Sequence, residues 1–249
     1  MFAAFMTDFQ DLIATVTKAN DSDWSHLDLI GEWRRKHFIK IAKLFDSFVT
    51  VLLNTQDYNT ACSIIRMIYD NWYSYVFIYC FSEGEERLLR YYLYVIDGIN
   101  QRKETMQNLH EGEEIEPEIK RIADDTIRKC EETKLQYVDL IHQLSLYPKH
   151  SAFIDRFVEK GWWQYKSLTG KKPSYYQWNE LYEKLSGKDT KAFMSFLSQY
   201  VHGLYLSSLT IVPSNEEMGF VFHEALRLVK SINIHLKEYP LIDVNDNGH

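Results

Sequence analysis

Proline, cysteine and long apolar runs are scarce in this chain of 249 residues, and each scarcity excludes something. The first 116 residues contain no proline, so nothing there prevents long helices. The three cysteines, Cys62, Cys80 and Cys130, form no CxxC pair, which argues against a disulfide framework or zinc site and favours a reducing compartment. The most apolar run, Trp72 to Phe81, has ten residues, whereas a bilayer span needs about 20.

Positive charge is also in the minority, with 28 basic residues against 35 acidic ones and a net charge of −7. This balance argues against nucleic acid as a partner without excluding a local basic face. The cluster Arg34-Arg35-Lys36, with Lys40 and Lys43, reads as a solvated helix face rather than a phosphate patch. The first eleven residues lack the basic region and cleavage site of a secretory signal. We therefore expect a cytoplasmic protein with no membrane partner.

The residues that are abundant indicate an all-α fold. Hydrophobic residues make up 45% of the chain and aromatic ones 15%, which excludes disorder. Apolar residues recur at steps of three and four, and no βαβ rhythm appears. We expect one domain over residues 1–249, a multi-helix bundle with two buried central helices. The expected helices cover residues 4–20, 29–54, 57–82, 84–110, 116–146, 175–186, 189–209 and 215–239.

Two helix starts carry capping signals. Asp57 precedes an apolar segment as an N-cap would, and Ser214 followed by Glu217 has the spacing of a capping box. The section from Glu111 to Glu132 holds nine acidic and four basic residues. We interpret it as a solvated helix face rather than an acidic partner-binding surface.

An aromatic-rich stretch, about residues 147–174, is expected to be an irregular connection. From Trp162 to Trp178, aromatic residues alternate with Lys166, Lys171 and Lys172. A connection packed on the bundle by its own aromatics is the first interpretation. A ligand lid, or base stacking combined with phosphate contacts, would use the same composition.

The two most apolar helices are each interrupted by polar residues. In residues 57–82, apolar side chains surround the helix, yet Arg66 and Asp70 stand four residues apart on one face. A buried charge is costly unless it is paired, so these two residues should form a buried ion pair. In residues 189–209, a polar line runs through Ser195, Ser198 and His202. Gly203, next to this line, would let another backbone or a ligand come close.

We expect these interruptions to meet, because buried polar groups must find partners. The candidate binding cluster is therefore Arg66, Asp70, Ser198 and His202, with His202 buried against the helix of the ion pair. The cluster is either structural or the site of a small ligand.

These residues also resemble a known pattern. Arg66-Met67-Ile68-Tyr69-Asp70, then Tyr182, then the segment Leu197 to Gly203 are similar to a prokaryotic family of uncharacterised helical proteins. That family has Arg-x-x-x-Glu and Leu-Ser-x-x-x-His-Gly helices, so this chain differs in carrying Asp70 at the acidic position. The resemblance covers roughly residues 40 to 210. It implies an all-helical fold and the candidate positions, but no reaction.

The same family is distantly similar to the HEPN group of helical proteins, some of which are metal-independent ribonucleases. Their signature is an arginine, four to six intervening residues and then a histidine on one helix. None of the ten arginines here has a histidine at that spacing. Arg66 and His202 are expected on different helices, so they could form such a pair only where the tertiary structure brings them together.

Other chemistries find little support. No HExxH motif, Gly-x-Ser-x-Gly elbow or phosphate loop is present, and Ser198 beside His202 is only helical adjacency. His202, His223 and Glu224 could converge on a metal, but we expect no metal and no cofactor. The function expected is that of an uncharacterised soluble helical protein, whose polar cluster is structural or binds a small ligand. A HEPN-like ribonuclease or nucleic-acid-binding protein of a defence or mobile-element system is the alternative. Enzymatic activity and a homodimer remain open.

Overall fold

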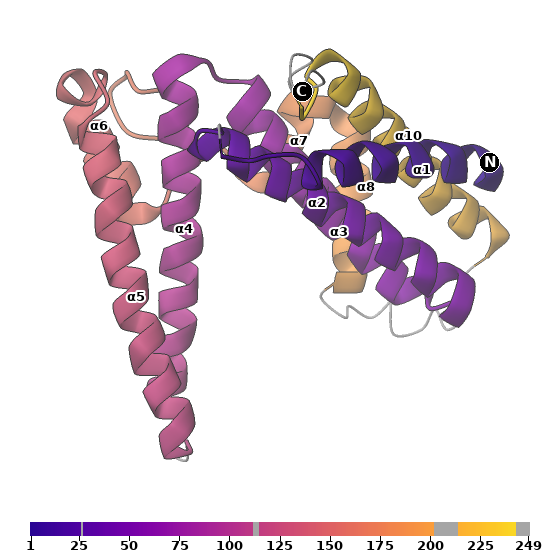
Figure 1. Ribbon diagram of the computed structural model, residues 1–249, viewed down its shortest axis with the longest axis horizontal. Coiled ribbons are helices and arrows are strands. Elements are labelled where there is room, and N and C mark those ends of the chain that lie inside the picture. Colours follow the sequence, from indigo (N-terminus) through magenta and orange to yellow (C-terminus); the bar gives the residue numbers. More distant parts are fainter. Residues whose placement is uncertain (26, 112–114, 202–213, 243–249) are drawn as a thin grey trace. The chain divides into compact units, whose positions relative to one another are not determined.

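The computed structural model describes residues 1–25, 27–111, 115–201 and 214–242 (Figure 1). The described residues form helices and connections, and their one β-type pairing is an isolated bridge between Tyr165 and Tyr175. The expected all-α fold is thereby confirmed. The chain falls into two compact units: unit 1 is Met1–Val76 with Asn179–His249, and unit 2 is Phe77–Trp178. The single domain stays a prediction, and each unit is described by itself.

Unit 1 is a layered bundle with an aromatic core. Its helices are α1 (Phe2–Asn20), α2 (Leu29–Thr50), α3 (Tyr58–Tyr75), α7 (Trp178–Ser186, of which Trp178 belongs to unit 2), α8 (Lys188–Val201) and α10 (Asn215–Glu238). A π-helical turn, η1 (Val51–Thr55), follows α2. Phe5, Phe45 and Phe48 from α1 and α2 are fully buried and contact Phe222 of α10 or one another. α3 packs against α2, α8 and α10, so it is a central helix as expected.

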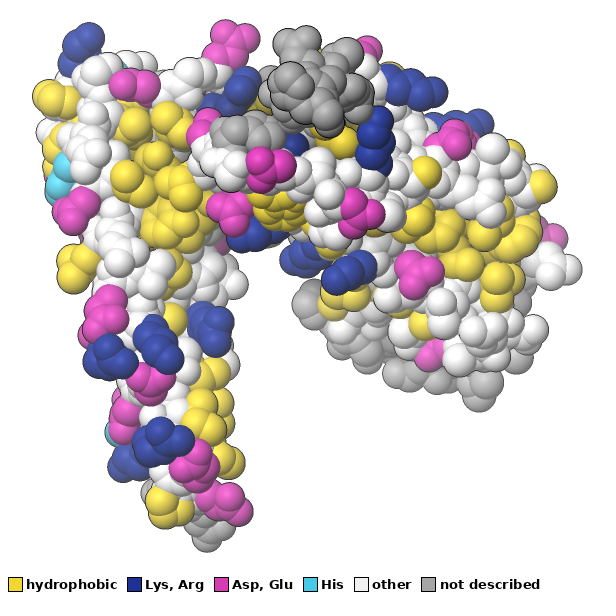
Figure 2. Space-filling view, viewed as in Figure 1, with side chains coloured by type: hydrophobic (Ala, Val, Ile, Leu, Met, Phe, Trp, Pro, Cys, Tyr) yellow, Lys and Arg dark blue, Asp and Glu magenta, His cyan; other side chains and the backbone are white. Residues whose placement is uncertain are grey.

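Unit 2 is built on a long antiparallel helix pair, α4 (Gly84–His110) and α5 (Pro117–His142), with α6 (Tyr147–Lys160) against both. A second π-helical turn, η2 (Val76–Cys80), leads into it from α3. Figure 2 shows charged side chains of both signs interspersed along this pair. On α5, Arg128 bonds the exposed Asp125 and Glu132, which confirms the interpretation of a solvated face. None of the helices in the described part of the chain has the length and apolar character to cross a bilayer.

Both predicted caps are confirmed. The Asp57 side chain accepts from the Thr60 backbone N–H at the start of α3, and Ser214 and Glu217 form a reciprocal capping box at the start of α10. α8 is described to Val201, so the end of the expected helix 189–209 lies outside the described residues.

Helix α6 corrects the expectation of an irregular connection over residues 147–174. Pro148 lies in its first turn, where a missing N–H costs no helical hydrogen bond, so this proline opens a helix. Just before the helix, the Glu85 carboxylate accepts from the backbone N–H groups of Ser145 and Leu146. Gly161, at φ 67°, ends it. Only the remainder, from residue 161, is a non-helical connection.

That remaining connection is packed on α4, which confirms the first interpretation of the aromatic stretch. Arg90 is 2% exposed, and its guanidinium lies 3.8 Å from the ring centroid of Tyr165 and 4.3 Å from that of Phe77. Its Nη1 donates to the carbonyl of Tyr165 at 2.9 Å. The aromatics of the connection therefore serve to hold it against one buried arginine.

The basic cluster of α2 is the second correction, because Arg34 and Arg35 are buried rather than solvated. Arg34 donates to the carbonyls of Tyr239 and Pro240, and Arg35 Nε donates to that of Leu241 at 2.9 Å. Carbonyls at and beyond a helix end lack helical hydrogen-bond donors. These two guanidinium groups supply the missing donors to the carbonyls of the segment that follows α10. Lys36, Lys40 and Lys43 are exposed as expected.

A buried hydrogen-bond chain adjoins Arg34. Arg34 Nε donates to the Tyr75 hydroxyl at 3.0 Å, and that hydroxyl lies 2.7 Å from His235 Nε2. Because Tyr75 accepts from Arg34, its own proton goes to His235, whose Nε2 is then unprotonated. Burial, and then the Arg34 charge, lower the pKa of His235 from 6.5 to about 4. Burial also lowers the pKa of His37 to about 4, against the opposing effect of its bond to the Asn71 carbonyl.

These two histidines predict an acid-sensitive fold. Between pH 6.5 and about 4 the unfolded chain binds protons that the folded chain does not, so the free energy of unfolding falls as pH falls through that window. The total loss should be on the order of a few kcal/mol. Urea denaturation at a series of pH values measures it. His235→Gln, which keeps an acceptor for Tyr75, should flatten the curve, whereas a variant as pH-sensitive as wild type would contradict the assignment. His142→Gln, at an exposed residue of α5, is the control.

Two glycines of unit 2 give a matched pair of predictions. At Gly161 the backbone is left-handed, and an added Cβ would lie 2.9 Å from Asp97 Oδ1. Gly161→Ala should therefore destabilise the protein by about 1–2 kcal/mol. Gly98, inside α4, has no atom within 4 Å of the same position, so Gly98→Ala should stabilise it by about 0.5–1 kcal/mol. Equal effects of the two substitutions in thermal melts would refute this reading of the α6 terminus.

Candidate functional site

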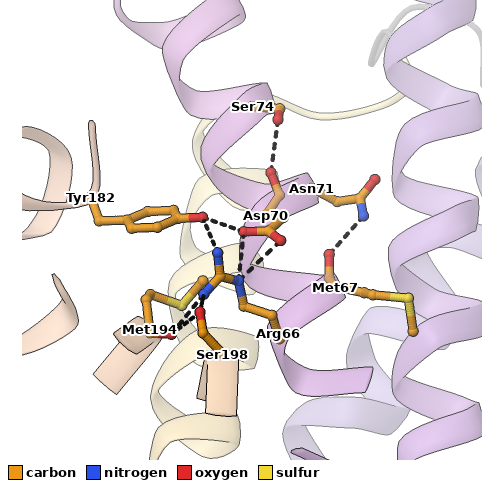
Figure 3. A network of polar contacts seen from close by, with 8 residues as sticks. All are labelled: Arg66, Met67, Asp70, Asn71, Ser74, Tyr182, Met194 and Ser198. Atoms are coloured by element: carbon orange, nitrogen blue, oxygen red, sulfur yellow. Dashed lines mark hydrogen bonds and ion pairs between the residues drawn. The ribbon is translucent and has the colours of Figure 1, made fainter. Parts of the chain in front are cut away.

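The candidate cluster joins three helices of unit 1 (Figure 3). Arg66 and Asp70 come from adjacent turns of α3, Tyr182 from α7, and Met194 and Ser198 from adjacent turns of α8. Each helix contributes because residues four apart share one face. The structure therefore brings together three of the four predicted residues, Arg66, Asp70 and Ser198.

Arg66 is the centre of the cluster. Its Nε donates to both Asp70 carboxylate oxygens at 3.1 Å. Its Nη1 donates to the Met194 carbonyl at 2.6 Å and to Ser198 Oγ, and its Nη2 donates to the Tyr182 hydroxyl at 3.0 Å. One guanidinium thus connects α3 to both α7 and α8.

The partners of Arg66 are also bonded to one another or to their own helix. The Tyr182 hydroxyl donates to Asp70 Oδ1, so it accepts from one member of the ion pair and donates to the other. Ser198 Oγ donates to the Met194 carbonyl at 2.9 Å while it accepts from Arg66. The directions of these bonds are mutually consistent, because each hydroxyl donates one hydrogen bond and accepts one.

The expected full burial of the ion pair is wrong. The Arg66 side chain is 16% exposed and that of Asp70 is 35% exposed. The pair is therefore inside the bundle at Arg66 and open at Asp70. A pair that reaches solvent contributes less than the 3–5 kcal/mol at stake when a fully buried one is broken.

Tyr182 is the residue that the candidate set lacked, although the family resemblance includes its position. Its side chain is fully buried, and burial, followed by the neighbouring Asp70 charge, raises the pKa of its phenol. The hydroxyl therefore stays protonated and remains a donor to Asp70. Apart from that resemblance, the signal that the sequence offers is its place one turn inside an amphipathic nine-residue helix.

The remaining expectations for α8 have different outcomes. Ser195, on the same expected polar line, is exposed and bonds the Lys191 carbonyl of its own helix, so it is not part of the cluster. His202 and Gly203 lie outside the described residues, and the expectation that His202 is buried stays a prediction. Among the described residues, no three His, Cys, Asp or Glu side chains gather as metal ligands would.

A second polar cluster lies on α10 and was missed. Glu224, 8% exposed, accepts from the Tyr69 hydroxyl at 2.9 Å and from Arg227 Nη2 at 2.6 Å. Arg227 also donates to Thr190 at 3.3 Å, which links α10 to α8. Sequence could have found the Glu224–Arg227 pair from its three-residue spacing, but nothing in it pairs Glu224 with Tyr69 across 155 positions.

Comparison with known proteins adds nothing to this geometry. No protein-family description, curated protein or solved structure matches the chain.

The hydroxyl of Tyr182 yields a direct test of the cluster. Tyr182→Phe keeps the ring but leaves Arg66 Nη2 and Asp70 Oδ1 each one bond short, so we expect a loss of about 1–2 kcal/mol in the free energy of unfolding. Tyr137→Phe is the matched control, since no hydrogen bond of its hydroxyl is found within the described residues. Chemical denaturation of both variants measures the difference. Equal stabilities would mean that the hydroxyl is not bonded inside the cluster.

Proposed function

We propose that this is a non-catalytic helical protein in which the Arg66 cluster fastens α3, α7 and α8 together. The observation that carries the proposal is the internal pairing of the cluster. Arg66, Asp70, Tyr182 and Ser198 satisfy one another or a backbone carbonyl. Of the two roles expected from sequence, structural or small-ligand binding, this pairing favours the structural one.

The chemistry of the individual groups supports a non-catalytic role. A serine nucleophile needs a base that accepts its proton, but the Ser198 proton goes to a backbone carbonyl. The raised pKa of Tyr182 keeps that phenol protonated. The Asp70 carboxylate already accepts from Arg66 and Tyr182. The described hydrogen bonds of these groups therefore run within the cluster or to a backbone carbonyl, which supports a structural role.

We infer a cytoplasmic location for the protein. Cys62 and Cys130 are buried thiols without a disulfide, as in a reducing compartment. Burial raises the pKa of Cys62 to about 12, so this thiol is neutral and unreactive at physiological pH.

One observation favours the second candidate, a HEPN-like ribonuclease. Arg66 donates to Ser198, and the sequence places His202 four residues further along the same segment. Residues four apart share one face of a helix, so this spacing favours the expectation that His202 and Arg66 form a pair, which lies outside the described residues. Such a pair could act on RNA without a metal ion.

Incubation of the full chain with labelled tRNA and total RNA, with and without chelator, separates the two candidates. We expect no cleavage and no salt-sensitive binding, because the described bonds of the cluster run within it or to a backbone carbonyl. Arg66→Lys should lower the melting temperature, since lysine cannot reproduce the forked bonds of the guanidinium. Chelator-resistant cleavage that is lost in both His202→Ala and Arg66→Lys would instead establish the ribonuclease. His223→Ala, on α10, is the control for loss of an unrelated histidine.

A further inference from the structure

An open groove between α1 and α2 is separate from the polar cluster. It has a volume of about 630 Å³ and is lined by residues of these two helices. Its floor is apolar and buried, and its walls are half-buried and apolar: Phe9, Val16 and Ala42 form the floor, and Met6, Ile13 and Ile39 the walls. Figure 2 shows hydrophobic side chains gathered on this unit between charged ones. From Met6 to Asn20 the groove follows about 21 Å of α1, close to four helical turns.

The charges at the groove are few and balanced. Among its lining residues only Lys43 and Asp46 are charged, and both are exposed. They lie three residues apart on α2 and so share one side of that helix. Because the two charges are opposite, a single anion or cation would be attracted by one of them and repelled by the other. An occupant that presents one charge of each sign, about one helical turn apart, can form an ion pair with both Lys43 and Asp46.

We propose that a second copy of this chain occupies the groove, with the two α2 helices antiparallel across a twofold axis. In a twofold interface the same surface meets itself, so a contact from Lys43 to Asp46 of the partner subunit is repeated in the opposite sense. The apolar walls of both copies are then buried together, as in a four-helix bundle. Ala14 and Thr17 at the groove are small enough to let a facing helix reach the usual packing distance of about 8–10 Å.

The groove suits a helical surface better than a small molecule. It follows α1 for close to four turns, whereas a small ligand is usually enclosed on most sides. A stable pair of proteins buries about 800 Å² on each partner, so the proposed interface extends beyond the groove over the neighbouring faces of α1 and α2. The inference does not depend on the Arg66 cluster or on the proposed function.

A charge exchange tests the pairing. We expect the full chain to be a dimer that dissociates on dilution in sedimentation equilibrium. Lys43→Glu sets two carboxylates against each other, and Asp46→Lys sets two ammonium groups against each other. Each should raise the dimer dissociation constant on the order of 10-fold. An equal mixture of the two variants should form heterodimers of near wild-type affinity, and the double variant K43E/D46K should recover the homodimer.

The controls separate dimerisation from folding. Lys230→Glu makes the same charge change at an exposed position of α10 outside the groove and should leave the dimer unchanged. Ile13→Glu should weaken the dimer while circular dichroism shows an intact helical fold. A wild-type chain that is monomeric at every concentration overturns the proposal. So does a dimer that is indifferent to the charge exchange, or a mixture of the two variants that forms no heterodimers.

Discussion

Buried guanidinium groups must find acceptors, and this requirement organises both units. Removing an arginine from water is costly, and the cost is recovered only when its donors meet oxygen atoms in good geometry. Arg34 and Arg35 meet the carbonyls that follow α10, Arg66 meets α7 and α8, and Arg90 meets the connection after α6. In each case at least one acceptor comes from a segment distant in sequence, so each arginine fixes at least one long-range contact.

The aromatic content of the chain makes these arrangements workable. A planar guanidinium can lie on a ring and still donate at its edges, as Arg90 does between Phe77 and Tyr165. Tyrosine adds a hydroxyl that both accepts and donates. The Tyr75 hydroxyl accepts from Arg34 and donates to His235. The Tyr182 hydroxyl accepts from Arg66 and donates to Asp70. The pKa of His235, the histidine at the end of one such chain, is lowered to about 4, first by burial and then by the Arg34 charge.

The Arg66 cluster and the α1/α2 groove differ in whether the described residues around them supply all their contacts. The cluster satisfies its own polar groups, so it fastens helices without a further component. The groove has apolar walls and one residue of each charge, and the described part of unit 1 leaves it open. In the proposed arrangement, the polar cluster stabilises unit 1 from within, and α1 and α2 meet the partner subunit. The ribonuclease alternative depends on His202 joining the cluster, a contact that would change its role from fastening to chemistry.

Local rules were enough for the helical class, most helix bounds and the caps at Asp57 and Ser214, because spacing and capping act within a few residues of the chain. They also paired Arg66 with Asp70, since four-residue spacing places both on one face. The sequence misassigned α6, where Pro148 fits a helix start as well as a helix end. It also placed Arg34 and Arg35 in solvent, because the carbonyls that they bond after α10 lie about 205 positions away. The choice of Tyr182 to complete the cluster, and the exposure of Asp70, were decided by how α7 and α8 pack on α3. Such contacts depend on tertiary structure because no residue's neighbours in sequence specify which distant carbonyl or hydroxyl will reach it.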